Sequence, residues 1–189
     1  MVERIIEAGA RVLLRYGYEG ASTNKIAAEA GVSPGSLYYY FSEKDDVIRG
    51  VLDRFLLALG NSLTATTARL DRVDRAVFEQ IVETMLTVLE QNRRLLEVTV
   101  DEAPRLVSPK TREAIHVRLE EHMRTAFLLL GTPLRGTRLD TGCWLATQLC
   151  LNLPVRYVLS RPAIPRDAFV DSLADQIGVL AGLPADRAG

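Results

Sequence analysis

Hydroxyl-bearing side chains crowd a short segment near the N-terminus, where Ser33, Ser36, Tyr38 and Tyr39 follow one another closely. Each hydroxyl can donate a hydrogen bond, and each tyrosine adds a flat aromatic face. Gly35 stands among them without a side chain, so a second molecule can approach the backbone closely there. Donors of this kind suit the recognition of phosphate oxygens and base edges, and they break no bonds by themselves. The segment therefore indicates a binding surface.

The rest of the chain offers little material for catalysis or metal binding. The sequence contains neither a glycine-rich phosphate loop nor a nucleophile elbow. His116 and Glu120 are one helical turn apart, but His122 is rotated by about 240° from His116, so a third ligand is missing. Cys143 and Cys150 would be about 10.5 Å apart along a helix, which leaves buried free thiols or a bridge across a dimer axis. We expect no catalytic residue, no metal site and no cofactor.

The residues around the hydroxyl-bearing segment predict two helices joined by a tight turn. Ser22 is a suitable N-cap for the first helix. The apolar face of that helix consists of Ile26, Ala27 and Ala30. Gly31 supplies the left-handed backbone of the turn, Ser33 caps the second helix, and Pro34 takes its first position, where a missing N–H costs nothing. This pattern is a helix-turn-helix.

Helical geometry predicts which side chains of the second helix point outward. At about 100° per residue, Ser33, Leu37 and Phe41 share the side that faces the core, with Tyr40 at its edge. The opposite side carries Gly35, Ser36, Tyr38 and Tyr39. In a helix-turn-helix this second helix enters the major groove of DNA. Two alternatives remain open: tyrosines that only fill a hydrophobic seam, Tyr40 first among them, and a glycine at position 35 that only permits close packing.

Two lysines stand in first turns of predicted helices, which is unusual for cations. Ser42 and Asp45 match a capping box at the start of a long helix, and Lys44 lies inside its first turn. A lysine there opposes the helix dipole unless an anion docks at the helix end. We expect Lys44, together with Lys25, to contact phosphates. The alternative for Lys44 is an ordinary solvated charge.

Together these residues resemble the N-terminal domain of the TetR family of bacterial transcriptional regulators, over roughly residues 3–55. The resemblance is carried by Tyr16-Gly17-Tyr18-Glu19, Ser22-Thr23, Ile26-Ala27, Ala30-Gly31-Val32-Ser33, Gly35 to Phe41, and Lys44. It implies DNA contacts at Thr23, Ser33, Gly35, Ser36, Tyr38, Tyr39 and Lys44. Members of the family usually carry a histidine at the position of Tyr40 or Tyr39, and many have a basic arm before the first helix. Because the first helix is predicted to begin almost at Met1, we expect no minor-groove contacts from such an arm.

Composition sets the broader class. The chain has 189 residues, 48% of them hydrophobic, a formal net charge of -1 and two cysteines. These values exclude a disordered chain and a disulfide framework, and no apolar stretch is long enough for a membrane helix. We therefore expect a cytoplasmic protein with no secretion signal. Residues 1–50 hold six basic and seven acidic groups, so we also expect weak non-specific DNA binding and a modest salt dependence.

The predicted fold is all-α, with about nine helices. Apolar stripes at three- and four-residue steps mark helices around residues 47–59, 78–89, 115–130, 139–159 and 169–180, and no segment alternates as a strand does. Gly17 is the predicted C-cap of the first helix. We expect a helix-turn-helix domain at residues 1–45 and a larger ligand-binding and dimerisation domain at residues 46–189.

The last two predicted helices indicate a dimer. The helix around residues 139–159 is apolar almost all round, so both of its sides need cover. The last helix carries small residues at four-residue steps, which permit close approach of a second helix. The predicted interface residues are Cys150, Ala174, Gly178 and Gly182. The alternative is a monomer in which these helices form the core.

Large or adaptable side chains on inward stripes are candidates for a ligand pocket. They are Phe55, Met85, Leu89, Met123, Phe127, Trp144 and Gln148. The alternative for each is a core residue, which is the commoner role of such side chains. Glu97, Asp101 and Glu102 can favour a cationic ligand or form a solvated face.

The sequence therefore favours a dimeric regulator that is no enzyme, binds a palindromic operator in double-stranded DNA, and is released by a small molecule that shifts the long helix after residue 43. Repression comes from the resemblance alone. One alternative is an all-helical small-molecule-binding protein or enzyme whose N-terminal helices are only structural. Another is a DNA-bound regulator controlled by a protein partner. The identity of the ligand and of the operator cannot be predicted from these residues.

Overall fold

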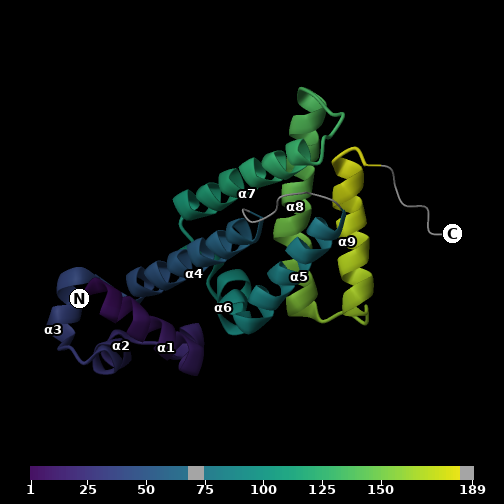
Figure 1. The fold of residues 1–189 in the computed structure, drawn as a ribbon. Helices are drawn as coiled ribbons and strands as arrows, with labels where there is room; N and C mark the ends of the chain where they lie inside the picture. Colours follow the sequence, from purple (N-terminus) through teal and green to yellow (C-terminus); the bar gives the residue numbers. More distant parts are fainter. Residues whose placement is uncertain (68–74, 184–189) are drawn as a thin grey trace. The chain divides into compact units, whose positions relative to one another are not determined.

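The computed structural model describes residues 1–67 and 75–183, and these ranges are almost entirely helical (Figure 1). The predicted all-α class is confirmed, since nine α-helices and no strand occur among the described residues. The elements are α1 (Val2–Gly20), α2 (Thr23–Ala30), α3 (Pro34–Tyr40), α4 (Lys44–Thr67), α5 (Arg75–Gln91), α6 (Arg93–Glu97), η1 (Val98–Glu102), η2 (Pro104–Leu106), α7 (Pro109–Leu129), α8 (Thr137–Ser160) and α9 (Arg166–Leu180).

The chain divides into two compact units. The first contains residues 1–58 and 92–113, and the second contains residues 59–91 and 114–189. This division differs from the single boundary that we expected after residue 45, because the first half of α4 and the segment from α6 to η2 pack into the N-terminal core. Within the predicted second domain, residues 68–74 and 184–189 lie outside the described residues.

The core of the first unit joins the helix-turn-helix to its support. Ile5, Leu13, Ile26, Leu37 and Ile48 are fully buried together, so α1, α2, α3 and α4 share one apolar interior. The later segment contributes to the same core through Val98, Ala103, Leu106 and Val107. Burial of a side chain of this size stabilises a fold by roughly 1.5–3 kcal/mol, so this shared core holds α3 firmly in place.

The first helix is interrupted at Gly17, where we predicted its end. Gly17 has φ 68° and ψ 177°, which only glycine adopts cheaply, and one further turn continues to Gly20. A Cβ atom at Gly17 would lie 2.6 Å from Nη2 of Arg94. The glycine therefore permits both the kink in α1 and the close approach of the Arg94 side chain.

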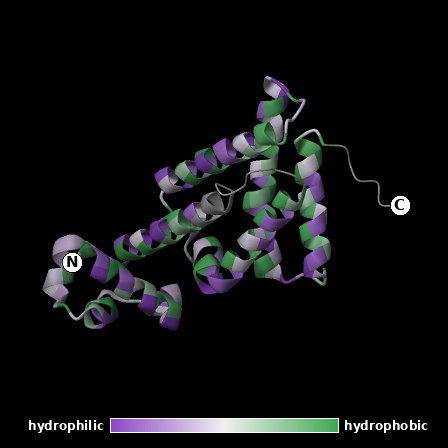
Figure 2. Cartoon of the chain, viewed as in Figure 1, coloured by the Kyte–Doolittle hydropathy of each residue, from purple (hydrophilic) through white to green (hydrophobic). Residues whose placement is uncertain are grey.

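In the second unit, α5, α8 and α9 pack against one another. Phe78 of α5 and Phe127 of α7 meet edge to face, with ring centroids 6.2 Å apart. Arg166 at the start of α9 donates to Glu83 at 2.8 Å and to Glu90 at 2.7 Å, which ties α9 to α5. The helices of both units carry hydrophobic and hydrophilic stretches side by side (Figure 2). Among the described residues, no helix is long and apolar enough to span a membrane.

Candidate nucleic-acid interface

The turn between α2 and α3 has the predicted geometry. Gly31 adopts φ 63° and ψ 41°, and its N–H donates to the Ala28 carbonyl at 3.1 Å. The N–H of Val32 donates to the Ala27 carbonyl at 3.0 Å. At the other end of α2, the Ser22 hydroxyl accepts from the Lys25 N–H at 3.3 Å, so the predicted N-cap is also present. These local bonds fix the angle at which α3 leaves α2.

The first turn of α3 is capped and open to its surroundings. Ser33 Oγ accepts from the Ser36 N–H at 3.1 Å, and the two hydroxyls lie 2.9 Å apart. A Cβ atom built on Gly35 would find only Ser33 Oγ within 4 Å, at 3.9 Å. Gly35 is therefore no packing glycine, and that alternative is wrong. The helix presents bare backbone at this point.

The three tyrosines of α3 all reach the surface. Tyr39 is 82% exposed, Tyr38 is 52% exposed and Tyr40 is 44% exposed, whereas Leu37 between the turns is fully buried. The prediction that Tyr40 fills the hydrophobic seam is wrong, because its ring stands edge-on to Tyr39 at 4.9 Å, outside the core. Tyr38 Oη lies 3.0 Å from Thr23 Oγ1, so α2 and α3 present one joint row of hydroxyls.

The sequence predicted that Ser33 and Phe41 share the core side of α3 with Leu37. Ser33 is exposed in the structure and Phe41 is partly buried. The reason is that Ser33 is the N-cap with extended backbone, φ -69° and ψ 151°, and Phe41 is the C-cap with φ -137°. Neither residue follows the helical rotation that the prediction assumed.

Both candidate lysines are held by the protein itself. Lys25 Nζ donates to the Gly20 carbonyl at 2.7 Å and lies 4.4 Å from the Tyr16 ring centroid. Lys44 Nζ donates to the Tyr18 carbonyl at 3.1 Å and lies 4.2 Å from the Tyr18 ring centroid. The prediction of a freely solvated Lys44 is thereby excluded. Its ammonium is fixed at the start of α4, where the helix dipole also attracts an anion.

The capping residue of α4 is one position later than predicted. Asp46 Oδ2 accepts from the N–H groups of Ser42 at 3.1 Å and Glu43 at 3.3 Å. Asp45, the residue that we expected in this role, points elsewhere because α4 begins only at Lys44. Its carboxylate instead accepts from Tyr18 Oη at 2.7 Å.

This contact belongs to a cluster that the sequence did not reveal, made of Tyr18, Lys44, Asp45, Glu102 and Arg105, and called the Tyr18 cluster below. Arg105 Nη2 donates to Tyr18 Oη at 2.6 Å and to Asp45 at 3.2 Å. The Tyr18 N–H donates to Glu102 at 2.9 Å. Burial, followed by the bond to Asp45, raises the pKa of Tyr18. The cluster ties the η1–η2 segment to both α1 and α4.

The acidic residues near this cluster correct a second prediction. Glu102 bonds Arg94 as well as Tyr18, and Glu97 pairs with Arg93 at 3.0 Å. These two carboxylates are therefore neither a solvated face nor free for a cationic ligand, while Asp101 is exposed.

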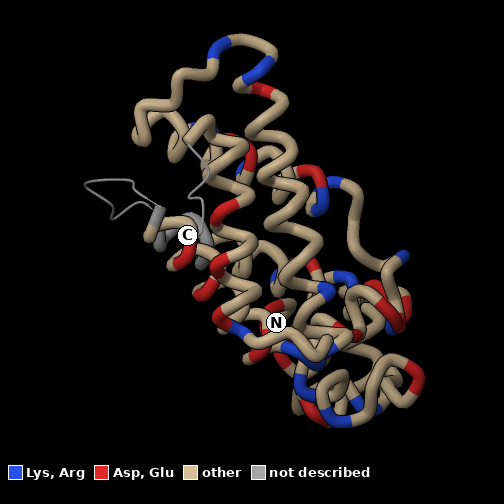
Figure 3. The backbone as a smooth tube through the Cα atoms, turned by 90° about the vertical axis from the view of Figure 1, so that its right-hand side faces the viewer, with Lys and Arg blue, Asp and Glu red and all other residues tan. Residues whose placement is uncertain are grey.

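Ion pairs also occupy acidic side chains of the N-terminal helices. Glu29 accepts from Arg11 at 2.6 Å and lies 3.8 Å from Arg15, and Arg54 pairs with Glu3 at 2.5 Å. Along the backbone, basic and acidic residues are interspersed (Figure 3). Carboxylates that are paired in this way repel an approaching phosphate less than free ones do.

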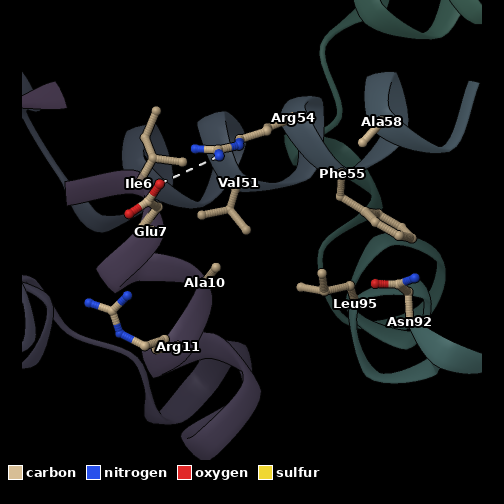
Figure 4. A pocket seen from close by; sticks show the side chains of 10 residues that line it. All are labelled: Ile6, Glu7, Ala10, Arg11, Val51, Arg54, Phe55, Ala58, Asn92 and Leu95. Carbon is tan, nitrogen blue, oxygen red and sulfur yellow. Dashed lines mark ion pairs between the residues drawn. The ribbon is translucent and has the colours of Figure 1, made fainter. Parts of the chain in front are cut away.

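A groove of about 350 Å³ lies in the first unit between α1, α4 and the start of α6 (Figure 4). Its lining residues are Ile6, Glu7, Ala10, Arg11, Val51, Arg54, Phe55, Ala58, Asn92 and Leu95. One end carries charges, including the pair of Arg54 and Glu7 at 3.5 Å, and the other end is formed by Phe55 and Leu95 with the Asn92 amide beside them. Of the predicted pocket residues, only Phe55 lies here.

The other predicted pocket residues belong to the second unit, and they do not share one site. Met85 and Met123 line a small cavity together. Leu89 and Phe127 are buried but line neither the groove nor this cavity. Gln148 is partly buried, with Nε2 3.5 Å from His116 Nδ1. Trp144 is 52% exposed and lines neither the groove nor the small cavity, so its prediction as a pocket residue is corrected.

The predicted interface residues also need correction. Cys150 is 2% exposed and Ala174 is fully buried, and Gly178 is buried as well, so all three face the interior of their own unit. Gly182 has φ 80° and approaches Pro133 in a turn. Helix α9 packs on α5 and α8 of the same chain, and Ala174 and Gly178 are buried in that packed interior. The exposed large apolar residues of α8 and α9 are Trp144, Leu145, Leu153 and Val179.

Neither cysteine forms a disulfide, and both are buried. Burial raises the pKa of Cys150 to about 12. Among the described residues, no three side chains of His, Cys, Asp and Glu gather as a metal site would require. Methionine sulfur lies outside that set of donors.

Comparison with known proteins shows similarity to bacterial transcriptional regulators in both sequence and fold. Residues 5–51 match the family model described as "Bacterial regulatory proteins, tetR family". The HTH-type transcriptional regulator PksA of Bacillus subtilis is 33% identical over 96 residues, which is 51% of this chain and 46% of that protein. The chain thus spans less than half the length of this curated relative.

Two solved structures share the fold of nearly the whole chain. A putative TetR-family regulator from Mesorhizobium loti superimposes with a TM-score of 0.68 at 19% identity, over 96% of this chain and 95% of the other. The regulator FadR from Bacillus subtilis, solved in complex with stearoyl-CoA, gives a TM-score of 0.68 at 16% identity, over 94% of this chain and 97% of the other. At this identity the likeness establishes the fold alone.

Proposed function

We propose that this chain, whose residues 5–51 match the model of the tetR family of bacterial regulatory proteins, is a dimeric transcription factor that binds a palindromic operator and leaves it when a small molecule binds. The observation that carries the proposal is the surface of α3. Its capped first turn presents bare backbone at Gly35, and Tyr38 and Tyr39 extend outward beside it. A surface of this kind fits the major groove, with hydroxyls for phosphates and base edges.

The proposed DNA contacts are Thr23, Lys25, Ser33, Gly35, Ser36, Tyr38, Tyr39 and Lys44. Thr23 and Tyr38 act as one unit, because their hydroxyls lie 3.0 Å apart and can bridge a single phosphate. Lys44 marks a phosphate position at the N-terminus of α4, where its ammonium is already held against Tyr18. A pre-positioned ammonium loses less side-chain entropy on binding than a free one.

The proposed test is a gel shift on DNA from upstream of the protein's own gene. Tyr39→Ala removes a ring that is 82% exposed, so it should weaken binding at least tenfold and leave the melting temperature unchanged. Lys110→Ala is a matched control for Lys44→Ala, because Lys110 also stands in the first turn of a helix, α7, and is exposed. If Tyr39→Ala and Lys44→Ala both bind like the wild type, α3 is not the reading helix.

The proposed dimer surface is the outer face of α8 and α9. Trp144, Leu145 and Val179 are 52%, 38% and 45% exposed in the single chain, and large apolar side chains of this kind mark protein contacts when they gather. A two-fold dimer implies operator half-sites one helical turn, or a multiple of it, apart. Light scattering tests the dimer directly, since a monomer at micromolar concentration would contradict it.

The proposed effector site is the groove between α1, α4 and α6. Its volume of about 350 Å³ falls in the range of small-molecule sites, and Phe55 and Leu95 at one end suit a hydrocarbon chain. FadR was solved with stearoyl-CoA, so acyl-CoA thioesters of increasing chain length are reasonable first probes. Any effector has to bind one conformation of α1 and α4 better than another, because differential affinity alone shifts an equilibrium.

Regulation by an effector distinguishes this proposal from its alternatives. The Tyr18 cluster links the η1–η2 segment to α1 and α4, and Arg94 of α6 donates to Glu102 of this cluster. A molecule that displaces α6 would therefore also displace the supports of α3. Loss of DNA binding on addition of a thioester, with no turnover of that thioester, supports a regulator over an enzyme. DNA binding that no small molecule affects would favour control by a protein partner. We place this activity in the cytoplasm, where the operator is.

A further inference from the structure

The small cavity of the second unit is lined by most of the soft donor atoms that the chain possesses. Four donors line it: Met85 from α5, His122 and Met123 from α7, and Cys150 from α8. The whole chain has only three methionines, two cysteines and two histidines. Both methionines after Met1 therefore meet one of the two cysteines and one of the two histidines at a single cavity.

The size of this cavity restricts its occupant. Its volume is about 20 Å³, and a single water requires roughly 10–15 Å³ on the same measure. An organic effector does not fit, but a single ion does. Apart from the four donors, the lining consists of Ile81, Leu119 and Ala126. Such a lining offers a water molecule few hydrogen-bond partners.

The donor atoms select a class of ion. Thioether and thiolate sulfur are soft ligands that favour Cu(I) over hard cations such as Mg²⁺ and Ca²⁺. Met85 is 3% exposed, Met123 is 6% exposed and Cys150 is 2% exposed, so solvent does not compete at the three sulfurs. Three different helices, α5, α7 and α8, each supply one sulfur. Metal sites in helical bundles are built in the same way, from side chains on facing helices.

Charge balance selects the oxidation state. A monovalent cation with one thiolate is neutral, so its burial in an apolar cavity leaves no net charge. A divalent cation with the same single thiolate leaves one uncompensated positive charge, which an apolar interior disfavours strongly. A site with one cysteine and two methionines is therefore matched to a monovalent ion.

We propose that this cavity binds one soft monovalent metal ion of the Cu(I) class through three sulfur atoms, Cys150 Sγ and the thioether sulfurs of Met85 and Met123. On binding, the S–H bond of Cys150 breaks, its proton leaves to solvent and a sulfur–metal bond forms, with no change of oxidation state. The ion binds without DNA, so this site stands whether or not the proposed function does.

The test uses the purified full-length chain without DNA, under anaerobic conditions, with Cu(I) supplied in competition with a chromogenic Cu(I) chelator. One ion should bind per chain, and X-ray absorption at the copper edge should show sulfur neighbours. Cys150→Ala should lower the affinity at least about 100-fold, and Met85→Leu and Met123→Leu about tenfold each. The two Met→Leu changes nearly conserve side-chain volume, so they keep the test decisive if Cys150→Ala fails to fold.

The second cysteine provides a matched control. Cys143 is also buried on α8, but it does not line the cavity, so Cys143→Ala should keep the wild-type affinity. Any of three results overturns the proposal: no stoichiometric Cu(I) binding, equal losses for the two cysteine variants, or Zn(II) binding with the same stoichiometry and affinity. The methionines would then be ordinary core residues that fill an irregular gap.

Discussion

Replacing Gly35 by alanine should have opposite effects on stability and on DNA binding. Gly35 is the second residue of α3, and an added Cβ would find only Ser33 Oγ within 4 Å, at 3.9 Å, which is an ordinary contact. Glycine costs a helix roughly 0.5–1 kcal/mol relative to alanine because it loses more backbone entropy on folding. Near the helix start we expect about 0.5 kcal/mol of added stability, or roughly 1–2 °C in melting temperature for a chain of this length.

The same methyl group would occupy space that the proposed complex needs. If the DNA backbone or a base edge approaches α3 at Gly35, the added carbon prevents close contact there. We expect at least a tenfold loss of affinity, which corresponds to about 1.4 kcal/mol. Urea denaturation gives the first quantity, and fluorescence anisotropy with labelled operator gives the second. The wild type and the Gly35→Ala variant have to be compared at one fixed salt concentration, because DNA affinity depends on the salt concentration.

Two other glycines provide controls for this prediction. Gly60 lies inside α4, and a Cβ there would meet no atom of the described residues within 4 Å, so Gly60→Ala should stabilise the protein without changing DNA affinity. Gly31 has φ 63°, so Gly31→Ala should cost about 1–2 kcal/mol of stability by strain. A Gly35→Ala variant that gains stability and binds DNA as well as the wild type would refute the placement of α3 against DNA.

Four further outcomes are expected. Lys44→Ala should make the slope of log affinity against log salt shallower by about one unit, and an unchanged slope would mean that Lys44 neutralises no phosphate. Trp144→Glu should convert the dimer to monomers in light scattering, whereas a persistent dimer would place the interface elsewhere. Ala10→Phe should fill the groove and abolish acyl-CoA binding in calorimetry while DNA affinity stays within about twofold. Cys150 should resist thiol reagents at pH 8 until the protein unfolds, because a pKa of about 12 leaves roughly one thiolate in ten thousand, and rapid labelling of the native protein would contradict its burial.

The helix-turn-helix could be predicted because its determinants act locally. Ser22, Gly31 and Ser33 each form a capping or turn hydrogen bond to a residue no more than five positions away. Serine and glycine are typical of such positions, so their presence predicts these bonds. The same locality explains the errors. The capping residue at α4 shifted from Asp45 to Asp46 because a helix boundary moved, and boundaries are the least determined feature of a local pattern.

Contacts between distant segments could not be predicted in this way, because no local sequence pattern indicates them. Tyr18 and Arg105 are 87 positions apart, and nothing in their spacing indicates that Arg105 will donate to the Tyr18 hydroxyl. The interface prediction failed for a related reason. Ala174 and Gly178 are buried within their own unit, but periodicity shows only that a face is packed and not which element packs on it.

The small negative net charge of the chain limits how it can bind DNA. With a net charge of -1, long-range attraction to phosphates is weak, so affinity depends on donors placed at contact distance. The ion pairs of Glu29 and Glu3 with arginines reduce the repulsion that these acids would cause, but they also occupy Arg11 and Arg54. Lys25 and Lys44 are the two first-turn cations next to α3, and both are held near backbone carbonyls. Because few phosphates can then be neutralised per subunit, we expect a modest salt dependence, and a salt slope that required six or more neutralised phosphates per subunit would be incompatible with this surface.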